Sequence, residues 1–215
     1  MLFDFDTLPP QERYKLVVSS VVPRPIAWVV TQDAEGVVNA APFSFFNVFS
    51  DNPVVLGFGC GPRAPGRTKD TLDNIKATGQ FVVCMVNQAT AEAMNVTAVD
   101  FPPGTDELAE AGLTKAPCAK VKPPRIAESP VALECETFQL IPVGHHHIVL
   151  GKVLAVHIHE NCMLDAAKHY VDTPALDLVG RMHGRGWYTR TTDRFEIPRL
   201  TPEQWAERKK QKAAE

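Results

Sequence analysis

Charged and hydroxylated residues gather in one short run, Arg67, Thr68, Lys69, Asp70 and Thr71. The apolar spacing that follows and a closing glycine predict a helix over residues 68–79, capped by Thr68 or Asp70. A helix start offers unpaired backbone N–H groups and a partial positive charge, which suit a phosphate. Two cationic side chains and two hydroxyl donors strengthen such a site. We therefore predict anion binding here; an ordinary solvated, capped helix start is the simpler alternative.

A second candidate is the small and aromatic segment 40–47, AAPFSFFN. In a strand, Phe43 and Phe45 would face one way while Ser44 and Phe46 face the other. Proline and small residues in a strand mark a bulge or an edge, where another group can approach the backbone. Such a surface suits a flat ring such as a flavin. Packing of the phenylalanines in the core is the alternative.

Glycines in the segment GFGCG, residues 57–61, would let the backbone come close to a ligand. The segment does not match the GxGxxG fingerprint, and no strand–helix crossover surrounds it. A Rossmann dinucleotide site is therefore not supported. Cys60 within this segment is a candidate reactive thiol.

Histidines are concentrated at 145–147, with two more at 157 and 159. Positions 147 and 157 would lie about 33 Å apart on one straight strand, too far to share an ion. No HExxH motif is present, and the five cysteines include no CxxC spacing. The sequence therefore predicts neither a metal site nor a disulfide framework.

Strand patterns dominate the rest of the chain. Apolar or alternating runs predict strands over 26–31, 37–49, 53–59, 81–86, 131–141, 148–159 and 187–196, with helices over 9–20 and 88–98. No regular β-α-β alternation is present, which favours an antiparallel barrel over a doubly wound sheet.

Residues 99–130 form a long, proline-rich excursion with a capped turn at 105–112. A loop of this length inside a compact domain is usually functional, for example as a lid. No repeat or linker is visible, so we expect one domain over 1–215, with a core at about 10–196 and a helical tail over 197–215. A capping box, TPEQ, begins at Thr201.

The composition is that of an ordinary globular protein of 215 residues, 45% hydrophobic and 22% charged. A net charge of −3 argues against a nucleic-acid partner. No apolar run approaches the roughly 18 residues of a membrane helix. The acidic start, MLFDFDTLPPQERY, does not resemble a signal peptide. We therefore expect no membrane association and a cytoplasmic location.

Taken in order, five segments resemble the flavin reductase-like family: PRPIAWVVT, NAAPFSFFN, RTKDTLDNI with FVVCMV, DELAEAGL…ESPVALECE, and HHHIVLGKV. The resemblance covers roughly residues 10–190. It implies a mainly β fold, the FMN-binding split β-barrel, antiparallel and Greek-key-like, with a few short peripheral helices. It also implies a homodimer with flavin near the subunit interface.

The resemblance further assigns residues to the cofactor, FMN held non-covalently. The residues that would contact the ring and the ribityl chain are Pro42, Phe43, Ser44 and Asn47, and Trp28 would lie beside them. Contacts to the phosphate fall to Arg67, Lys69, Asp70 and Thr71, with Asn74 close by. His147 would lie near the nicotinamide or the flavin as the catalytic residue. Apart from the resemblance, Tyr188 in the glycine-rich stretch 181–191 is a candidate for stacking near the cofactor.

The implied activity is hydride transfer from NADH or NADPH to flavin N5, which demands positioning more than acid–base chemistry. Reduced flavin could supply a partner monooxygenase. Two alternatives stay open: a flavin-binding electron carrier of the flavoredoxin type, and a split-barrel FMN enzyme that acts on an organic substrate.

Overall fold

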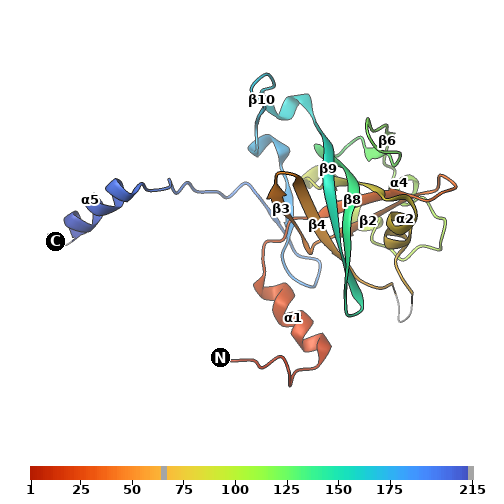
Figure 1. Cartoon of the computed structure of the whole chain (residues 1–215), viewed down its shortest axis with the longest axis horizontal. Helices are drawn as coiled ribbons and strands as arrows, with labels where there is room; N and C mark the ends of the chain where they lie inside the picture. The colour runs from red at the N-terminus through yellow and green to blue at the C-terminus, as the bar shows by residue number, and fades with distance from the viewer. Residues whose placement is uncertain (64–66, 213–215) are drawn as a thin grey trace.

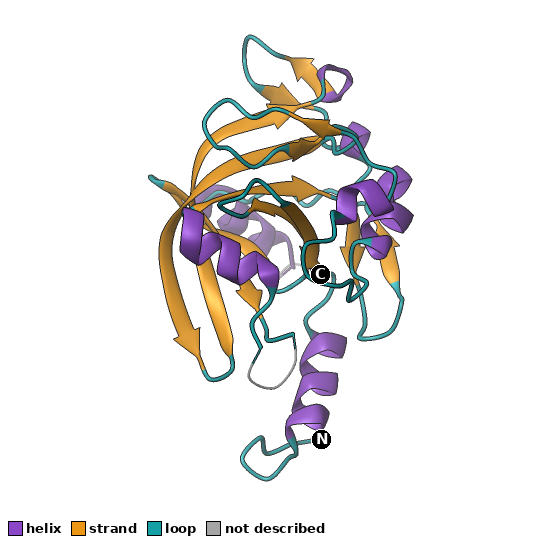
Figure 2. Ribbon diagram, turned by 90° about the vertical axis from the view of Figure 1, so that its right-hand side faces the viewer, coloured by secondary structure: helices purple, strands orange, loops and turns teal. Residues whose placement is uncertain are grey.

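The protein is built on one strongly curled antiparallel sheet with short helices around it (Figures 1 and 2). The computed structural model describes residues 1–63 and 67–212. The main sheet contains β1 (Ala27–Gln32), β2 (Val38–Phe43), β3 (Phe46–Asp51), β4 (Val54–Cys60), β5 (Gln80–Met85), β8 (Val131–Val143) and β9 (His146–Ile158). Its strand order is β2-β1-β5-β8-β9-β4-β3, and every pairing is antiparallel.

Three small ribbons flank the sheet. They pair β6 (Lys115–Ala116) with β7 (Arg125–Ile126), β10 (Met163–Asp165) with β11 (Tyr170–Val171), and β12 (Val179–Arg181) with β13 (Tyr188–Arg190). The α-helices are α1 (Pro10–Ser20), α2 (Asp70–Thr78), α3 (Ala91–Val96), α4 (Glu107–Glu110) and α5 (Pro202–Lys212). Short 3₁₀ turns lie at Gln88–Thr90, Glu160–Cys162 and Pro174–Leu176.

Barrel closure follows from the strand order. The two outermost strands, β2 and β3, are consecutive in the chain and are joined by only Ser44 and Phe45. A link this short spans roughly 10 Å at most, so the sheet must curl until its first and last strands meet. A hydrogen bond from the Gly59 amide to the Phe45 carbonyl, 2.8 Å long, ties this corner to β4. The predicted antiparallel barrel with short helices is confirmed.

Both faces of the sheet are buried over β1, which explains its unbroken apolar sequence. Trp28 and Val30 lie in a cluster on the outer face, under α3, α4 and the 117–126 segment. Val29, from the other face, packs in the barrel interior with Phe58 and Phe81. The alternation of side chains along a strand divides β1 between these two cores.

α2 closes one end of the barrel. Its Leu72 and Ile75, one helical turn apart, pack into the interior cluster. The helix ends at Gly79, whose φ of 69° lies in the left-handed region and whose N–H donates to the Ile75 carbonyl at 2.9 Å. Glycine adopts this conformation without the Cβ clash of other residues, as the sequence predicted.

Some predicted elements were wrong in extent. The expected strand over 37–49 is two strands, since the chain turns the barrel corner at Ser44 and Phe45. The expected strand over 187–196 is only β13, and the residues after it pair with no strand among those described. The helix predicted over 88–98 is a 3₁₀ turn followed by the six-residue α3.

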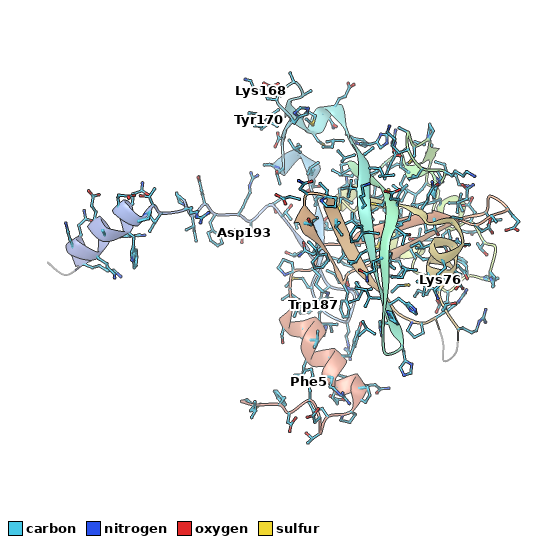
Figure 3. All side chains as sticks on the ribbon, in the orientation of Figure 1. Phe5, Lys76, Lys168, Tyr170, Trp187 and Asp193 are labelled. Atoms are coloured by element: carbon cyan, nitrogen blue, oxygen red, sulfur yellow. The ribbon has the colours of Figure 1, made fainter. Side chains whose placement is uncertain are left out.

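The two ends of the described chain project from the barrel. Figure 1 shows α1 below the body and α5 at the end of an extended segment, and Figure 3 places Asp193 on that segment. α5 begins with the predicted capping box, because the Thr201 N–H donates to Gln204 and the Gln204 N–H donates back to Thr201. None of its described residues is buried.

Candidate functional site

A groove runs along β2, the first strand in the order of the sheet, between the start of α2 and residues 94–101. It consists of two cavities, which share Pro42 and Ala98. The first has a volume of about 80 Å³, and its walls include Asn39, Pro42, Arg63, Lys69, Thr71 and Glu107. The second has a volume of about 210 Å³, and its walls include Ile26, Ser44, Asn95, Arg181 and Tyr188. We call the two together the β2 groove.

One end of the β2 groove is the N-terminus of α2. Lys69, Asp70 and Thr71, three of the residues that the resemblance assigned to the phosphate, all line it. The predicted caps were wrong: Lys69 is the N-cap, and no side chain among residues 1–63 and 67–212 caps this helix. Thr68 instead donates its hydroxyl to the Asp73 carboxylate at 2.6 Å. The first backbone N–H groups of α2 are therefore left for solvent or a ligand.

Arg63 is a wall residue that the sequence prediction missed. Its guanidinium lies 3.3 Å from the Asp70 carboxylate and 4.0 Å from that of Asp100, and it donates to the Phe101 carbonyl. These contacts join the start of α2 to residues 100–101, which begin the long excursion. The excursion thus supplies a wall of the groove.

Glu107 is the second wall residue that was missed. It comes from α4, is 8% exposed, and accepts a hydrogen bond from the Ala40 amide at 3.0 Å. The Asn39 amide reaches Thr71 Oγ1 at 3.0 Å and, in the orientation that satisfies both of its ends, donates to Glu107 Oε1 at 3.2 Å. Burial, with a smaller effect of Asp70, raises the pKa of Glu107. A protonatable carboxyl group therefore stands beside the helix start.

The predicted ring-binding residues separate by strand face. Pro42 lies in the groove and pairs with Trp28 across the β1–β2 ladder. Trp28 is fully buried behind this wall, where its indole N–H donates to Thr97 Oγ1 at 2.9 Å. Phe43 points into the barrel and packs on Phe58 with ring centroids 4.9 Å apart. Only the backbone of Phe43 therefore remains for the outer face.

Ser44, Asn47 and Asn74 lie around the groove at different distances from it. Ser44 lines the second cavity and accepts a hydrogen bond from Arg24 at 3.3 Å. Asn47 is on β3, beyond the barrel corner, in a separate cavity with Ser44 and α1 residues. Asn74 faces the sheet from α2 and donates to Thr31 Oγ1 at 3.1 Å. Of the three, the structure brings only Ser44 into the β2 groove.

Arg67 and His147 lie in a different cavity, which we call the hairpin cavity. Its volume is about 730 Å³, and its walls are Arg63, Arg67, Thr68 and Leu72 with Cys60, Gly61 and the three histidines of the β8–β9 hairpin. His147 pairs with Cys60 across the β4–β9 ladder. Arg63 lines both cavities. The run from Arg67 to Thr71 is thus divided between two places.

The glycines of 57–61 make room for protein, not for a ligand. A Cβ on Gly57 would stand 2.6 Å from Leu150, and one on Gly61 would stand 2.9 Å from the His146 ring. Most of the segment is strand β4, with only its last residue beyond. Burial is also the main factor that raises the pKa of the Cys60 thiol to about 11. The raised pKa disfavours Cys60 as the candidate reactive thiol.

Comparison with known proteins identifies the family. Residues 18–174 match the family described as "Flavin reductase like domain". The chain belongs to this family. A Deinococcus radiodurans protein is 48% identical over 209 residues, which cover 95% of this chain and 92% of that protein. A Bacillus subtilis protein, YwrF, is 35% identical over 92% of this chain and 98% of its own length.

Solved structures agree with the fold. Nitrilotriacetate monooxygenase component B from Bacillus cereus superposes with a TM-score of 0.86 at 28% identity, covering 92% of this chain and 98% of its own. The 2-nitrobenzoate 2-nitroreductase NbaA of Pseudomonas fluorescens gives 0.86 at 32% identity, covering 94% and 98%. A Shewanella frigidimarina protein described as a flavin reductase with a split barrel domain matches at a TM-score of 0.78 and 21% identity, over 93% of this chain and all of its own.

These matches confirm the predicted family and its split-barrel fold. A flavin-binding family fits a groove whose donors are a lysine, an arginine and helix N–H groups, because these are phosphate donors. None of the described helices has the length and apolar character needed to cross a bilayer.

Proposed function

We propose that this flavin reductase-like protein is an FMN-dependent oxidoreductase that takes hydride from NADH or NADPH. The observation that carries the proposal is the β2 groove, where an uncapped helix start with Lys69 and Thr71 adjoins a flat strand surface at Pro42. One end of the groove offers phosphate donors, and the other end offers an apolar floor. A flavin mononucleotide has this same division between an anionic end and a flat ring.

In this proposal the phosphate lies against Lys69 and the first N–H groups of α2, that of Thr71 among them. Arg63 is held in reach by Asp70, so it offers a second cation. The ribityl chain and ring would continue over Pro42 toward Ser44, in the cavity that Tyr188 closes. Trp28 and Phe43 would support this wall from behind, while Asn47 and Asn74 would support its edges. Bound FMN would supply the hydride-accepting chemistry.

The chain's own residues would contribute by orienting the reactants. The wall formed by residues 97–101 and Glu107 covers the phosphate end and limits its contact with water. We place the anionic part of the dinucleotide on the side of the hairpin cavity, where Arg67 and His147 can meet it. The nicotinamide would extend from there to the flavin ring at the Ser44 end of the groove. Holding the nicotinamide against the flavin ring can lower the barrier to such a transfer substantially.

A homodimer is part of the proposal. The cavities of the β2 groove are each smaller than the roughly 300 Å³ of typical ligand pockets, so a flavin would extend beyond one protomer. Near its open end, the corner and edge strand β3 expose Phe45, Val48 and Phe49 at 42%, 55% and 65%. Exposed apolar residues on an edge strand suit burial by a second copy.

A specific observation favours each of two extensions. The likeness to nitrilotriacetate monooxygenase component B supports reduced flavin as a product for a partner monooxygenase. The likeness to NbaA supports instead an enzyme that keeps FMN and reduces an organic substrate. Retention of reduced flavin through gel filtration under anaerobic conditions would favour the second. A flavin-binding carrier without NAD(P)H turnover is the remaining alternative.

The test is the visible spectrum of the purified protein with FMN, before and after NADH or NADPH under anaerobic conditions. We expect flavin absorbance that co-elutes with the protein and bleaches with at least one nucleotide. Binding without bleaching by either nucleotide would support the carrier. Failure to bind FMN would refute the proposed function altogether.

A further inference from the structure

A cluster of three different ligand types lies away from the β2 groove. It consists of Cys118, from the segment between β6 and β7, Glu134 on β8, and His157 on β9. One sulfur, one carboxylate oxygen and one ring nitrogen lie within 4.8 Å of one another. Within residues 1–63 and 67–212, no other group of three or more Cys, His, Asp or Glu side chains converges in this way.

The sheet explains why two of these side chains meet. His157 pairs with Ala132 across the β8–β9 ladder, and Glu134 stands two residues along β8 on the same face. This diagonal arrangement brings long side chains of neighbouring strands into contact. His157 Nε2 lies 2.5 Å from Glu134 Oε1. The 117–121 segment then crosses this face and adds Cys118.

Glu134 is held in a fixed position. Its side chain is fully buried, and it accepts backbone N–H bonds from Ala119 at 2.8 Å, Lys120 at 2.5 Å and Val121 at 3.1 Å. Outer contacts of this kind orient a ligating carboxylate before an ion arrives. His157 is 31% exposed, so an ion can enter from its side.

We infer that Cys118, Glu134 and His157 form a binding site for a divalent transition-metal ion such as zinc. Thiolate, imidazole and carboxylate together suit borderline ions, whereas calcium and magnesium prefer oxygen ligands alone. Three protein ligands leave a fourth tetrahedral position for water. Since β8 is three strands from β2, roughly 14 Å along the sheet, the ion would not touch the groove.

An ion bound between His157 Nε2 and Glu134 Oε1 would displace the proton of the hydrogen bond that joins these two atoms. On binding, this proton moves to Nδ1 of the imidazole and the Cys118 thiol releases its own proton to solvent. The ion then bonds to the thiolate, the imidazole nitrogen and the carboxylate oxygen. The N···O distance would widen to roughly 3.3 Å, as expected for ligands about 2.0 to 2.2 Å from a tetrahedral centre.

The test is a titration of the chelator-stripped full chain with Co²⁺, followed by competition with Zn²⁺. We expect one equivalent of Co²⁺ to produce tetrahedral d–d bands and a thiolate-to-cobalt charge-transfer band, both removed by Zn²⁺. Cys118→Ser should abolish the charge-transfer band, and His157→Gln should weaken binding about 100-fold. Cys60→Ser is the matched control, because Cys60 also stands beside a histidine, and it should leave the bands unchanged.

Persistence of the charge-transfer band in Cys118→Ser, its loss in Cys60→Ser, or saturation without any such band would overturn the site. Far-UV circular dichroism of the metal-free variants shows whether each is folded. Should Cys118→Ser fail to fold, the His157→Gln titration decides: unchanged Co²⁺ affinity would overturn the site. Glu134 is left intact, because its loss would free the three backbone N–H groups that it holds.

Discussion

The β2 groove and the hairpin cavity lie on the two sides of the same short segment, yet they differ in size, lining and exposure. The groove is narrow, and a carboxyl group and a helix start make its α2 end polar. The hairpin cavity is larger, and imidazoles and an exposed arginine surround it. Arg63 is the one wall residue common to both among those described.

The comparison shows that charged residues adjacent in sequence need not form one binding site. The run from Arg67 to Thr71 has the composition of a single phosphate site, but neighbouring side chains of an extended segment diverge before the helix begins. Arg67 turns to the hairpin, while Lys69 and Thr71 turn to β2. This division would give one cationic side chain to the groove, for the cofactor, and another to the hairpin cavity, for the reductant.

The largest effect should come from Lys69→Ala. Loss of a charge-assisted hydrogen bond to a phosphate should raise the Kd for FMN roughly 10- to 100-fold. Fluorescence quenching of FMN titrated with protein measures this change. Lys76→Ala is the matched control, because Lys76 carries the same charge on the exposed last turn of the same helix (Figure 3). Equal losses in the two variants would indicate only a general charge effect.

His147→Ala should act on the reductant instead. We expect the KM for NADH or NADPH to rise about tenfold with the Kd for FMN changed less than twofold, since the side chain lies in the hairpin cavity. Steady-state kinetics and flavin titration together separate the two quantities. His169→Asn, in the exposed turn between β10 and β11 and outside the lining of both the groove and the hairpin cavity, serves as the control. Weaker FMN binding by His147→Ala would contradict the assignment of the hairpin cavity to the reductant and the groove to FMN.

Arg67→Ala also tests whether the hairpin cavity and the β2 groove bind different molecules, and its expected effect is smaller. Its exposed guanidinium should assist an anionic dinucleotide by about fivefold in KM, and the effect should shrink as salt is added. FMN affinity should stay within about twofold of the unaltered protein. A loss of FMN affinity as large as that of Lys69→Ala would show instead that Arg67 binds the FMN phosphate.

Glu107→Gln should have the smallest effect on binding and a distinct effect on stability. Since burial raises the pKa of Glu107, the folded state holds this proton more tightly than the unfolded chain does. The free energy of unfolding should therefore fall as the pH rises from the ordinary value of 4.5 through the raised folded pKa. Glu107→Gln should flatten this dependence and tighten FMN binding about two- to threefold.

Urea unfolding at about pH 5 and about pH 8 measures this dependence. Glu110→Gln, on the exposed side of the same helix, is the matched control and should keep the slope of the unaltered protein. If Glu107→Gln keeps that slope too, the carboxyl group is not the source of the pH dependence.

Much of the fold could be predicted from the chain because its signals are local. The apolar period and Gly79 predicted α2, and the β-branched and aromatic run over 26–31 predicted the strand β1. Barrel closure at Ser44 and Phe45 could not be read in this way, because it depends on which strands become the edges of the sheet. The prediction of a single domain over 1–215 stays a prediction.

The candidate site was only partly predictable for the same reason. Lys69 and Thr71 stand in a recognisable helix start, whereas Glu107 joins them from an excursion some 36 residues later and no spacing rule connects them. Arg63 lies close in sequence to the run from Arg67 to Thr71, but only the fold shows that its guanidinium meets Asp70. The Cys118, Glu134 and His157 cluster has no motif spacing, because three separate elements bring it together.

The central claim is that the start of α2 binds the phosphate of FMN, and a two-by-two comparison tests it most directly. The Kd values of FMN and of riboflavin, which lacks the phosphate, are measured for the unaltered protein and for Lys69→Ala. We expect the unaltered protein to prefer FMN by roughly 10- to 100-fold, and Lys69→Ala to lose most of that preference. An unchanged preference in Lys69→Ala would contradict the account and place the phosphate elsewhere.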